Sequence, residues 1–488
     1  MREHEHDRSR RDFIKSMAMG AALAALPLHG WAADAPAPAR RPNILFIFTD
    51  EQFAGVLGAA GSPGLKTPAL DALAASGVRF ENAYCTYPLC TPSRASLMTG
   101  RMPHEVGITN NVQPLPESGR QQEMGWLFRN AGYDTAYAGK WHLPKQLMEE
   151  GHGFEILCGM DDKLVTEKSA EFLQRQRGEK PFLLVASFIE PHGICSFTRF
   201  PDPRRKIEIA WPYATPRDPG FLGACPPLPP NFAPATDRPE AVTEHRNQQK
   251  DMSGDKRPAF WAPEEEFNAA AKWPDAHYRY YRWAYDRLVE RVDAQIGQVL
   301  AALRDSGQAD NTLVVFTSDH GEMMGAHGLV MKQFFYQESI RVPLLVSFPG
   351  HVRKGQVVAA PLVSNGLDLL PTLCDYSGVR PPEGLRGQSL RPLLEGKTPA
   401  DWRRDLVVEC TTPNSRLLHT GRHKYMVYAT GANREELFDL QSDPGELKSL
   451  ASSADHRETL ADLRRRLRER CLESQDAEGA AMVPGAEA

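Results

Sequence analysis

The sequence lacks the features that mark several protein classes. Its 488 residues carry a formal net charge of only −5, too small an excess to attract nucleic acid or an anionic membrane. The eight cysteines are dispersed and show no Cys-x-x-C spacing, which argues against a disulfide framework or a zinc site. Internal repeats are absent as well. We therefore expect a globular protein with mostly free thiols, room for one disulfide, and no nucleic-acid partner.

A long apolar run is also missing, and the apolar stretch near the N-terminus indicates export instead. Arg10 and Arg11 lie in the run SRRDFIK, and the mildly apolar SMAMGAALAALPL follows. That stretch is too short to span a bilayer, and no cysteine follows it for lipid attachment. We predict a twin-arginine signal peptide over residues 1–34, transient contact with the export machinery, no membrane anchor, and a periplasmic or secreted mature protein.

Beyond a Pro/Ala linker, the chain alternates apolar runs with helical patterns. Continuous apolar runs are typical of buried parallel strands. They occur at residues 43–50, 133–143, 181–192, 311–321 and 342–350. The clearest helix spans about 277–304, with apolar residues at four-residue steps. Strands alternating with helices predict an α/β fold over residues 42–398, with a large central, mostly parallel sheet flanked by helices.

The C-terminal part of the chain has a different pattern of apolar segments. From about Asp401 the apolar segments are short, which predicts a small subdomain of antiparallel sheet plus helix over residues 399–472. Residues 473–488 are rich in Ala, Glu and Gly, and we expect them to be disordered. Within the larger part, the proline-rich segment 194–265 breaks the pattern. We interpret it as a substrate-side loop or, equally, as a spacer.

The run CTPSRASLMTGR, residues 90–101, carries the most informative chemistry. Cys90 lies at a predicted helix start next to Arg94. The helix dipole and the guanidinium both favour negative charge, so both lower the pKa of a thiol at that place. The same two features attract a tetrahedral oxyanion. The motif therefore predicts a reactive position that faces an anionic group.

Polar residues also gather where four predicted strands end, which in open α/β sheets is the edge that binds ligands. They are Asp50, Lys140 with His142, His192, and Asp319 with His320. Carboxylates suit Ca²⁺ or Mg²⁺, and an imidazole also admits Mn²⁺ or Zn²⁺. Arg94, Lys140 and Lys332 provide positive charge for an oxyanion. Adjacent strand residues point to opposite faces, so Glu51 belongs to this group only if the chain bends directly after Asp50.

These motifs together resemble the type I, formylglycine-dependent sulfatases of the alkaline-phosphatase superfamily, from about Pro42 to Leu450. The matching runs are NILFIFTD, CTPSRASLMTGRMPHEVGI, GKWHL, TSDHGEMMGAHGL, ESIRVPLLVSFPG and LFDLQSDPGELKSL. The resemblance implies hydrolysis of a sulfate monoester of a small molecule or a carbohydrate. It also implies that a formylglycine-installing enzyme converts Cys90 to 3-oxoalanine (formylglycine).

The resemblance implies a role for each site residue. The ligands of one divalent cation, Ca²⁺ foremost with Mg²⁺ or Mn²⁺ as alternatives, would be Asp50, Glu51, Cys90, Asp319 and His320. Arg94 and Lys140 would hold the aldehyde hydrate and the sulfate. His142 would accept a proton from the hydrate, and His192 with Lys332 would serve the leaving group. One hydroxyl of the hydrate would attack sulfur to give a covalent sulfo-enzyme, and the second would expel sulfate.

Three positions depart from the family pattern and leave alternatives open. Many members have Asp where this chain has Glu51 and Asn where it has His320, and the run GICSF after His192 replaces a proline-containing continuation. Members with the SDHG run include phosphonate monoester and phosphodiester hydrolases, so phosphoryl transfer is an alternative. Another is an exported non-catalytic protein that binds sulfated ligands with an unmodified Cys90, although such a protein has no need of proton-transfer residues.

Overall fold

The computed structural model describes residues 41–112, 123–143, 151–175, 180–195, 223–248, 273 and 275–485. The export signal predicted over residues 1–34 lies outside this part of the chain. In the described part, no helix combines the length and the apolar character that a membrane span needs.

An eight-stranded sheet forms the framework, with the strand order β5-β4-β6-β1-β7-β8-β2-β9. Its strands are β1 (Asn43–Asp50), β2 (Val78–Phe80), β4 (Asp134–Gly139), β5 (Glu155–Cys158), β6 (Phe182–Pro191), β7 (Thr312–Ser318), β8 (Leu344–Ser347) and β9 (Gln356–Val358). The five strands from β5 to β7 run parallel, and β1 lies between β6 and β7. The predicted large, mostly parallel sheet is therefore confirmed.

One strand runs against the parallel direction. The apolar run at 342–350 forms β8, which pairs with β7 in antiparallel register. Parallel neighbours need a long crossover connection, usually a helix. The connection from β7 to β8 holds only the short helix α12 (Gln337–Ile340) and a single 3₁₀ turn, so the chain returns beside the strand it has left.

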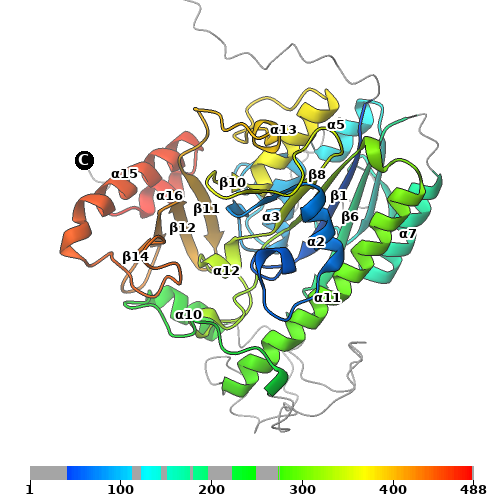
Figure 1. The fold of residues 1–488 in the computed structure, drawn as a ribbon. Helices are drawn as coiled ribbons and strands as arrows, with labels where there is room; N and C mark the ends of the chain where they lie inside the picture. Colours follow the sequence, from blue (N-terminus) through cyan, green and yellow to red (C-terminus); the bar gives the residue numbers. More distant parts are fainter. Residues whose placement is uncertain are drawn as a thin grey trace, which may run out of the picture. The chain divides into compact units, whose positions relative to one another are not determined.

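Helices cover both faces of the sheet. As a result every residue of β1 is buried, although alternate side chains point to opposite sides. Leu45 and Ile47 pack with apolar residues of α2 (Pro68–Ser76), α7 (Asp162–Arg175) and α11 (Asp275–Asp305). Phe46 and Phe48 pack with residues of α3 (Cys90–Thr99), α5 (Met124–Asn130) and α13 (Asn365–Ser377). Figure 1 shows α11 running along the sheet on the side that carries α2.

In the C-terminal part of the chain, four consecutive strands form a second sheet, which is antiparallel as predicted. It consists of β11 (Leu406–Thr411), β12 (Asn414–His419), β13 (His423–Tyr428) and β14 (Glu435–Asp439). One of its faces packs on α15 (Arg457–Glu473), and the other joins the core of the larger sheet. Further short elements are the parallel strand pair of β3 (Ala83–Tyr84) with β10 (Val363–Ser364) and the helix α14 (Arg391–Leu394).

The predicted disorder of residues 473–488 is wrong for the described residues 473–485. They contain the helix α16 (Ala477–Met482), and Met482 and Val483 are buried in the core of the small sheet. Asp476 begins this helix by accepting a hydrogen bond from the Gly479 N–H at 2.9 Å, and it pairs with Arg416 at 2.5 Å. Apolar contact and a buried ion pair thus order a segment whose composition alone indicates disorder.

Part of the proline-rich segment 194–265 lies outside the described residues. Residues 194–195 and 223–248 of this segment are described, and the longer stretch contains α10 (Glu240–Gln248) and contacts loops of the small sheet. The Thr236 N–H donates to the Leu447 carbonyl at 2.9 Å, and the Glu240 carboxylate accepts from the Ala432 N–H at 2.8 Å. This portion therefore connects to the C-terminal part of the chain, and its role as a substrate-side loop stays a prediction.

Candidate active site

Four adjacent parallel strands deliver polar residues to one edge of the large sheet. Asp50 ends β1, and Asp319 directly follows β7. Lys140 follows β4, and His192 follows β6. Because β4, β6, β1 and β7 are neighbours in the sheet, their carboxyl ends meet at one place. The structure brings these predicted residues together as the sequence indicated.

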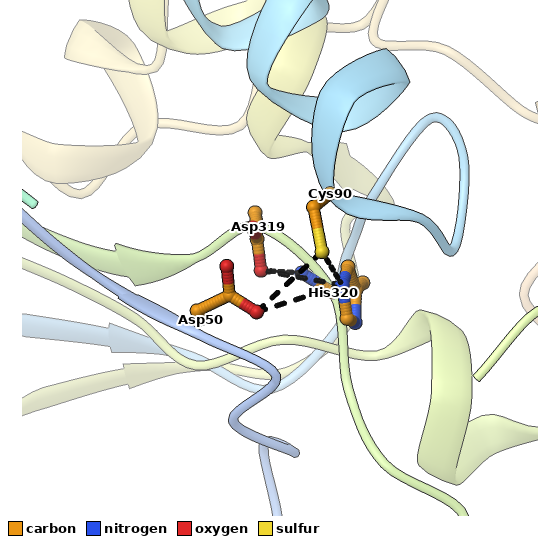
Figure 2. A group of neighbouring side chains, drawn as sticks. All are labelled: Asp50, Cys90, Asp319 and His320. Atoms are coloured by element: carbon orange, nitrogen blue, oxygen red, sulfur yellow. Dashed lines mark hydrogen bonds and ion pairs between the residues drawn. The ribbon is translucent and has the colours of Figure 1, made fainter. Parts of the chain in front are cut away.

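Cys90, in the first turn of α3, lies beside Asp50, Asp319 and His320 (Figure 2). Its Sγ lies 3.3 Å from His320 Nε2 and 3.6 Å from Asp50 Oδ1. The donor atoms of Asp50, Cys90, Asp319 and His320 all lie within 4.8 Å of one another. Each of the four side chains is at most 1% exposed. Oxygen, nitrogen and sulfur donors thus surround one small buried space, which we call the four-donor group.

Arg94 holds the two carboxylates of the four-donor group. Its Nη2 donates to Asp50 Oδ2 at 2.7 Å, and its Nε donates to Asp319 Oδ2 at 2.8 Å. Nη1 donates to the Lys140 carbonyl at 2.6 Å and to Ser187 Oγ at 2.9 Å. All three guanidinium nitrogens thus bond to protein groups, and the role of Arg94 in holding the aldehyde hydrate and the sulfate stays a prediction.

Lys140 supplies the second cation of the site. Its Nζ lies 2.5 Å from Asp50 Oδ2 and 3.9 Å from Cys90 Sγ. Burial and the nearby Cys90 act to raise the pKa of Asp50, but Lys140, His192 and Arg94 outweigh them and lower it. Asp50 is therefore ionised in spite of complete burial.

The position of Cys90 favours the thiolate. Burial acts to raise the pKa of this thiol, but Lys140, Lys332, His320 and a hydrogen bond with His142 lower it well below its ordinary value. The helix start contributes in the same direction. Gly100, with φ 68°, follows the last helical residue ten positions after Cys90, so α3 is a short, fully buried helix that begins at the reactive position. The sequence-based prediction of an activated cysteine at a helix start thus agrees with the geometry.

Asp319 and His320 are a coupled pair. Burial and the neighbouring Asp50 raise the pKa of Asp319 to about 6. For His320, burial acts to lower the pKa, but the charges of Asp319 and Cys90 raise it to about 9. His320 Nδ1 lies 2.9 Å from the Gly321 carbonyl, an acceptor that fixes the proton on this nitrogen. Nε2 is left facing the other three donors.

Glu51 does not lie in the four-donor group. The chain does bend at this residue, with φ 72°, but the bend turns the carboxylate toward Lys332. Glu51 Oε2 lies 2.9 Å from Lys332 Nζ, and Glu51 groups with His192 and Cys195 instead. Its other oxygen, Oε1, is buried and has no hydrogen-bond partner among the described residues, and the ligand role of Glu51 stays a prediction.

The two remaining histidines lie at the rim of the site. His192 is 24% exposed, and its Nε2 lies 4.0 Å from Asp50 Oδ1. His142 adopts a left-handed backbone conformation with φ 49°, and its carbonyl accepts from Thr91 Oγ1 at 2.7 Å. Among the described residues, its buried Nδ1 has no hydrogen-bond partner. This nitrogen is a candidate proton acceptor.

Sequence reasoning missed two residues of the site, Cys195 and Glu322. Cys195 Sγ lies 3.1 Å from Glu51 Oε2. Glu322 accepts from the Tyr281 hydroxyl at 2.8 Å, and burial together with the charge of Glu51 raises its pKa to about 8. The available signals were the unusual run after His192, which contains Cys195, and the TSDHGE run, which contains Glu322.

Comparison with known proteins identifies the fold and the family. The family model described as Sulfatase matches residues 42–379, and that described as N-sulphoglucosamine sulphohydrolase, C-terminal, matches residues 325–473. The Delta 4,5-hexuronate-2-O-sulfatase of Bacteroides thetaiotaomicron is 32% identical, with 92% of each chain covered. A solved 2-O GAG sulfatase is 30% identical, with a TM-score of 0.76 and coverage of 90% of this chain and 93% of that one.

A further solved structure holds a ligand. That protein was solved in complex with its substrate D-glucosamine-2-N,6-O-disulfate, and it is 26% identical to this chain, with a TM-score of 0.74. The alignment covers 90% of this chain and 99% of that one. Since a sulfatase family model spans more than half of the sequence and the relatives match almost end to end, the chain belongs to the sulfatase family, enzymes that hydrolyse sulfate esters.

Proposed function

We propose that this sulfatase hydrolyses a sulfate ester of a carbohydrate, with Cys90 converted to formylglycine and one divalent cation in the four-donor group. The observation that carries the proposal is the position of Cys90. It begins a buried helix, its Sγ is 3.3 Å from His320 Nε2, and two carboxylates and two cationic side chains surround it. The family assignment favours an enzyme over the non-catalytic binder considered from sequence.

The four-donor group fits a divalent cation. Two carboxylates and an imidazole with its second nitrogen bonded to a carbonyl are a common ligand set, and hard oxygens favour Ca²⁺ ahead of Mg²⁺ or Mn²⁺. Position 90 completes the set through its side chain. When bound, the cation stabilises negative charge on the sulfate oxygens and acidifies a hydroxyl at position 90.

The other side chains have distinct tasks in this proposal. Arg94 keeps Asp50 and Asp319 in place, and Lys140 lies close enough to position 90 to contact a sulfate bound there. His142 takes a proton at its unpartnered Nδ1, which general-base catalysis requires. A formylglycine hydrate supplies the nucleophilic hydroxyl and a second hydroxyl from which that proton is removed.

In this proposal His192 and Lys332 act on the leaving group. His192 is partly exposed, and its Nε2 lies 3.8 Å from Glu51 Oε2, the oxygen that Lys332 Nζ approaches to 2.9 Å. A histidine at this place donates a proton to the departing alcohol oxygen, a contribution of about 10²–10⁴-fold. The contribution is largest for alkyl alcohols such as sugar hydroxyls, whose anions are poor leaving groups. Relatives named for hexuronate and GAG sulfates support a sulfated sugar as the substrate.

The decisive test is mass spectrometry of the peptide that contains residue 90, from protein made in a host with the modifying enzyme. We expect the aldehyde at Cys90, and we expect Cys90→Ala to abolish turnover, while Cys158→Ser at a partly exposed thiol remains active. A fully active protein with an intact Cys90 thiol would contradict the proposal.

Phosphoryl transfer is the competing reaction, because family members with the SDHG run, here residues 318–321, include phosphonate monoester and phosphodiester hydrolases. Comparing kcat/KM for sulfated monosaccharides with kcat/KM for phosphodiesters and phosphonate monoesters separates the two. We expect the sulfate esters to have the higher value. A higher value for phosphodiesters would assign the site to the alternative.

We also propose twin-arginine export of the folded enzyme, which places the modification of Cys90 before export. The support is the Arg10–Arg11 pair in its SRRDFIK context. Replacing both arginines by lysine should retain the enzyme in the cytoplasm, as measured by cell fractionation. Periplasmic activity of the double variant would contradict this route.

A further inference from the structure

The residue that follows Cys90 ties the start of α3 to the segment after β4. The Thr91 side chain is fully buried, and its Oγ1 donates a hydrogen bond to the His142 carbonyl at 2.7 Å. The two residues lie 51 positions apart in the sequence. This hydrogen bond therefore links the backbone beside the reactive position to the backbone of the candidate proton acceptor.

Thr91 can make this contact because it lies in the first turn of the helix. Inside a helix, a threonine hydroxyl commonly bonds to the carbonyl four residues earlier. Thr99, the last residue of α3, does so, since its Oγ1 donates to the Ala95 carbonyl at 2.7 Å. The residue four positions before Thr91 precedes the helix. The Thr91 hydroxyl reaches across to the neighbouring segment instead.

The backbone of Thr91 is itself held in place. Its N–H donates to Asn111 Oδ1 at 3.1 Å. An N–H in the first turn of a helix has no partner inside the helix, so an acceptor from another segment fixes this turn. The β-branched side chain of threonine has few rotamers. The direction in which the Thr91 hydroxyl points is therefore well defined.

His142 needs such support because its backbone is strained. Its φ of 49° lies in the left-handed region, which is unfavourable for a residue with a Cβ. Trp141 and Leu143, its neighbours in the chain, are each 3% exposed and pack in the apolar core. Among the described residues, its buried Nδ1 has no hydrogen-bond partner. The bond from Thr91 thus fixes the peptide that carries the imidazole, while this ring nitrogen stays available for a proton.

We propose that Thr91 is a positioning residue for His142, which it holds where a proton is taken from the formylglycine hydrate. The proposal rests on the proposed function. In the second half of that reaction, the proton of the remaining hydroxyl moves to His142, the aldehyde C=O bond forms, and the C–O bond to the sulfate group breaks. Thr91 does not touch the reacting atoms. Its loss should slow the release of sulfate and leave the first half of the reaction intact.

The test compares Thr91→Val, which keeps the shape of the side chain without the hydroxyl, with Thr91→Ser, which keeps the hydroxyl. In Thr91→Val we expect kcat for 4-nitrophenyl sulfate to fall about 10–10²-fold, because a catalytic group out of place loses that much. We expect kcat/KM to change by less than about threefold, since it reports the first half of the reaction. Rapid mixing should show a burst of 4-nitrophenol equivalent to the active enzyme, followed by slow turnover. Thr91→Ser should retain most of the wild-type kcat.

Thr99→Val is the matched control, because Thr99 lies in the same helix, is 2% exposed and also loses a 2.7 Å hydrogen bond. It should keep the wild-type kcat. Mass spectrometry of the peptide that contains residue 90 gives the formylglycine content of each variant, and all rates are expressed per formylglycine. Equal falls of kcat and kcat/KM in Thr91→Val, or no recovery in Thr91→Ser, would overturn the proposal.

His142→Ala separates this proposal from the proposed function. It should show the same burst and a turnover slower than that of Thr91→Val, because it removes the proton acceptor itself. A burst in His142→Ala without one in Thr91→Val would overturn the role of Thr91 alone. The lack of a burst in His142→Ala would instead contradict the proton transfer that the proposed function assigns to His142, and the role of Thr91 with it.

Discussion

Arg94 illustrates how one buried side chain organises the site at the scale of a single residue. It joins Asp50 and Asp319 through two different nitrogens, and it is 1% exposed. Lysine keeps the charge but reaches only one carboxylate, so the other is left without its partner. We expect Arg94→Lys to lower the free energy of unfolding by about 3 kcal/mol and kcat/KM by about 10²–10³-fold.

The measurement is guanidinium unfolding of chelator-treated protein, together with kinetics of the holoenzyme. Arg380→Lys is the matched control, because Arg380 also pairs with a carboxylate but is 85% exposed. An exposed pair contributes about 0–1 kcal/mol. Equal stability of the two variants would mean that Arg94 does not organise the carboxylates.

At the scale of elements, strand ends could be predicted from sequence and the local turns after them could not. The apolar runs placed Asp50, Lys140, His192 and Asp319 at one sheet edge, because parallel strands share the direction of their carboxyl ends. The aim of Glu51 depends on a positive φ that long-range contacts with Asp319 and Tyr285 impose. No local pattern encodes such contacts, so the sequence alone does not show which side chains the Glu51 carboxylate faces.

The contact between α12 and the small sheet makes an element-scale prediction. Lys424 on β13 is fully buried, and its Nζ donates to the Phe335 carbonyl at 2.6 Å and to the Glu446 carboxylate. Glu446 in turn accepts from the Gln337 N–H at 2.8 Å. Glu446→Gln leaves a buried ammonium without its counter-charge, and we expect a loss of about 3–5 kcal/mol in the free energy of unfolding.

Guanidinium unfolding of three variants tests this. Glu383→Gln, at an 87% exposed carboxylate, should leave the free energy of unfolding nearly unchanged. The double variant Lys424→Met/Glu446→Leu removes both charges, and we expect it to recover most of the loss. A double variant as unstable as Glu446→Gln would show that the packing of these side chains matters more than their charges.

At the scale of the whole molecule, the two sheets depend on each other. The Sulfatase family model matches up to residue 379 and the C-terminal family model matches from residue 325, so the two matched regions share residues 325–379. Leu406 and Val408 of β11 pack in the same apolar cluster as Phe46 of β1. One of the polar links to the small sheet is His104, whose Nδ1 lies 2.6 Å from Glu409 on β11 and whose Nε2 lies 3.0 Å from the Ser474 carbonyl.

This link makes the stability of the molecule depend on pH. Burial acts to lower the pKa of His104, but the hydrogen bond and charge of Glu409 raise it from 6.5 to about 9. Because the folded-state pKa is above the unfolded value, the stabilisation is complete below pH 6.5 and is lost as the pH rises through about 9. The shift corresponds to on the order of 3 kcal/mol.

Denaturant unfolding of wild type and His104→Gln between pH 6 and pH 9.5 measures the effect. The glutamine keeps a donor to Glu409 but does not titrate, so its free energy of unfolding should be lower than that of wild type at pH 6 by about 3 kcal/mol. The difference should shrink steadily toward pH 9 as His104 loses its proton. His351→Gln, at an exposed histidine, controls for the general effect of pH. A difference that stays constant across this range would mean that His104 joins the two sheets by packing alone, without the charge that Glu409 stabilises.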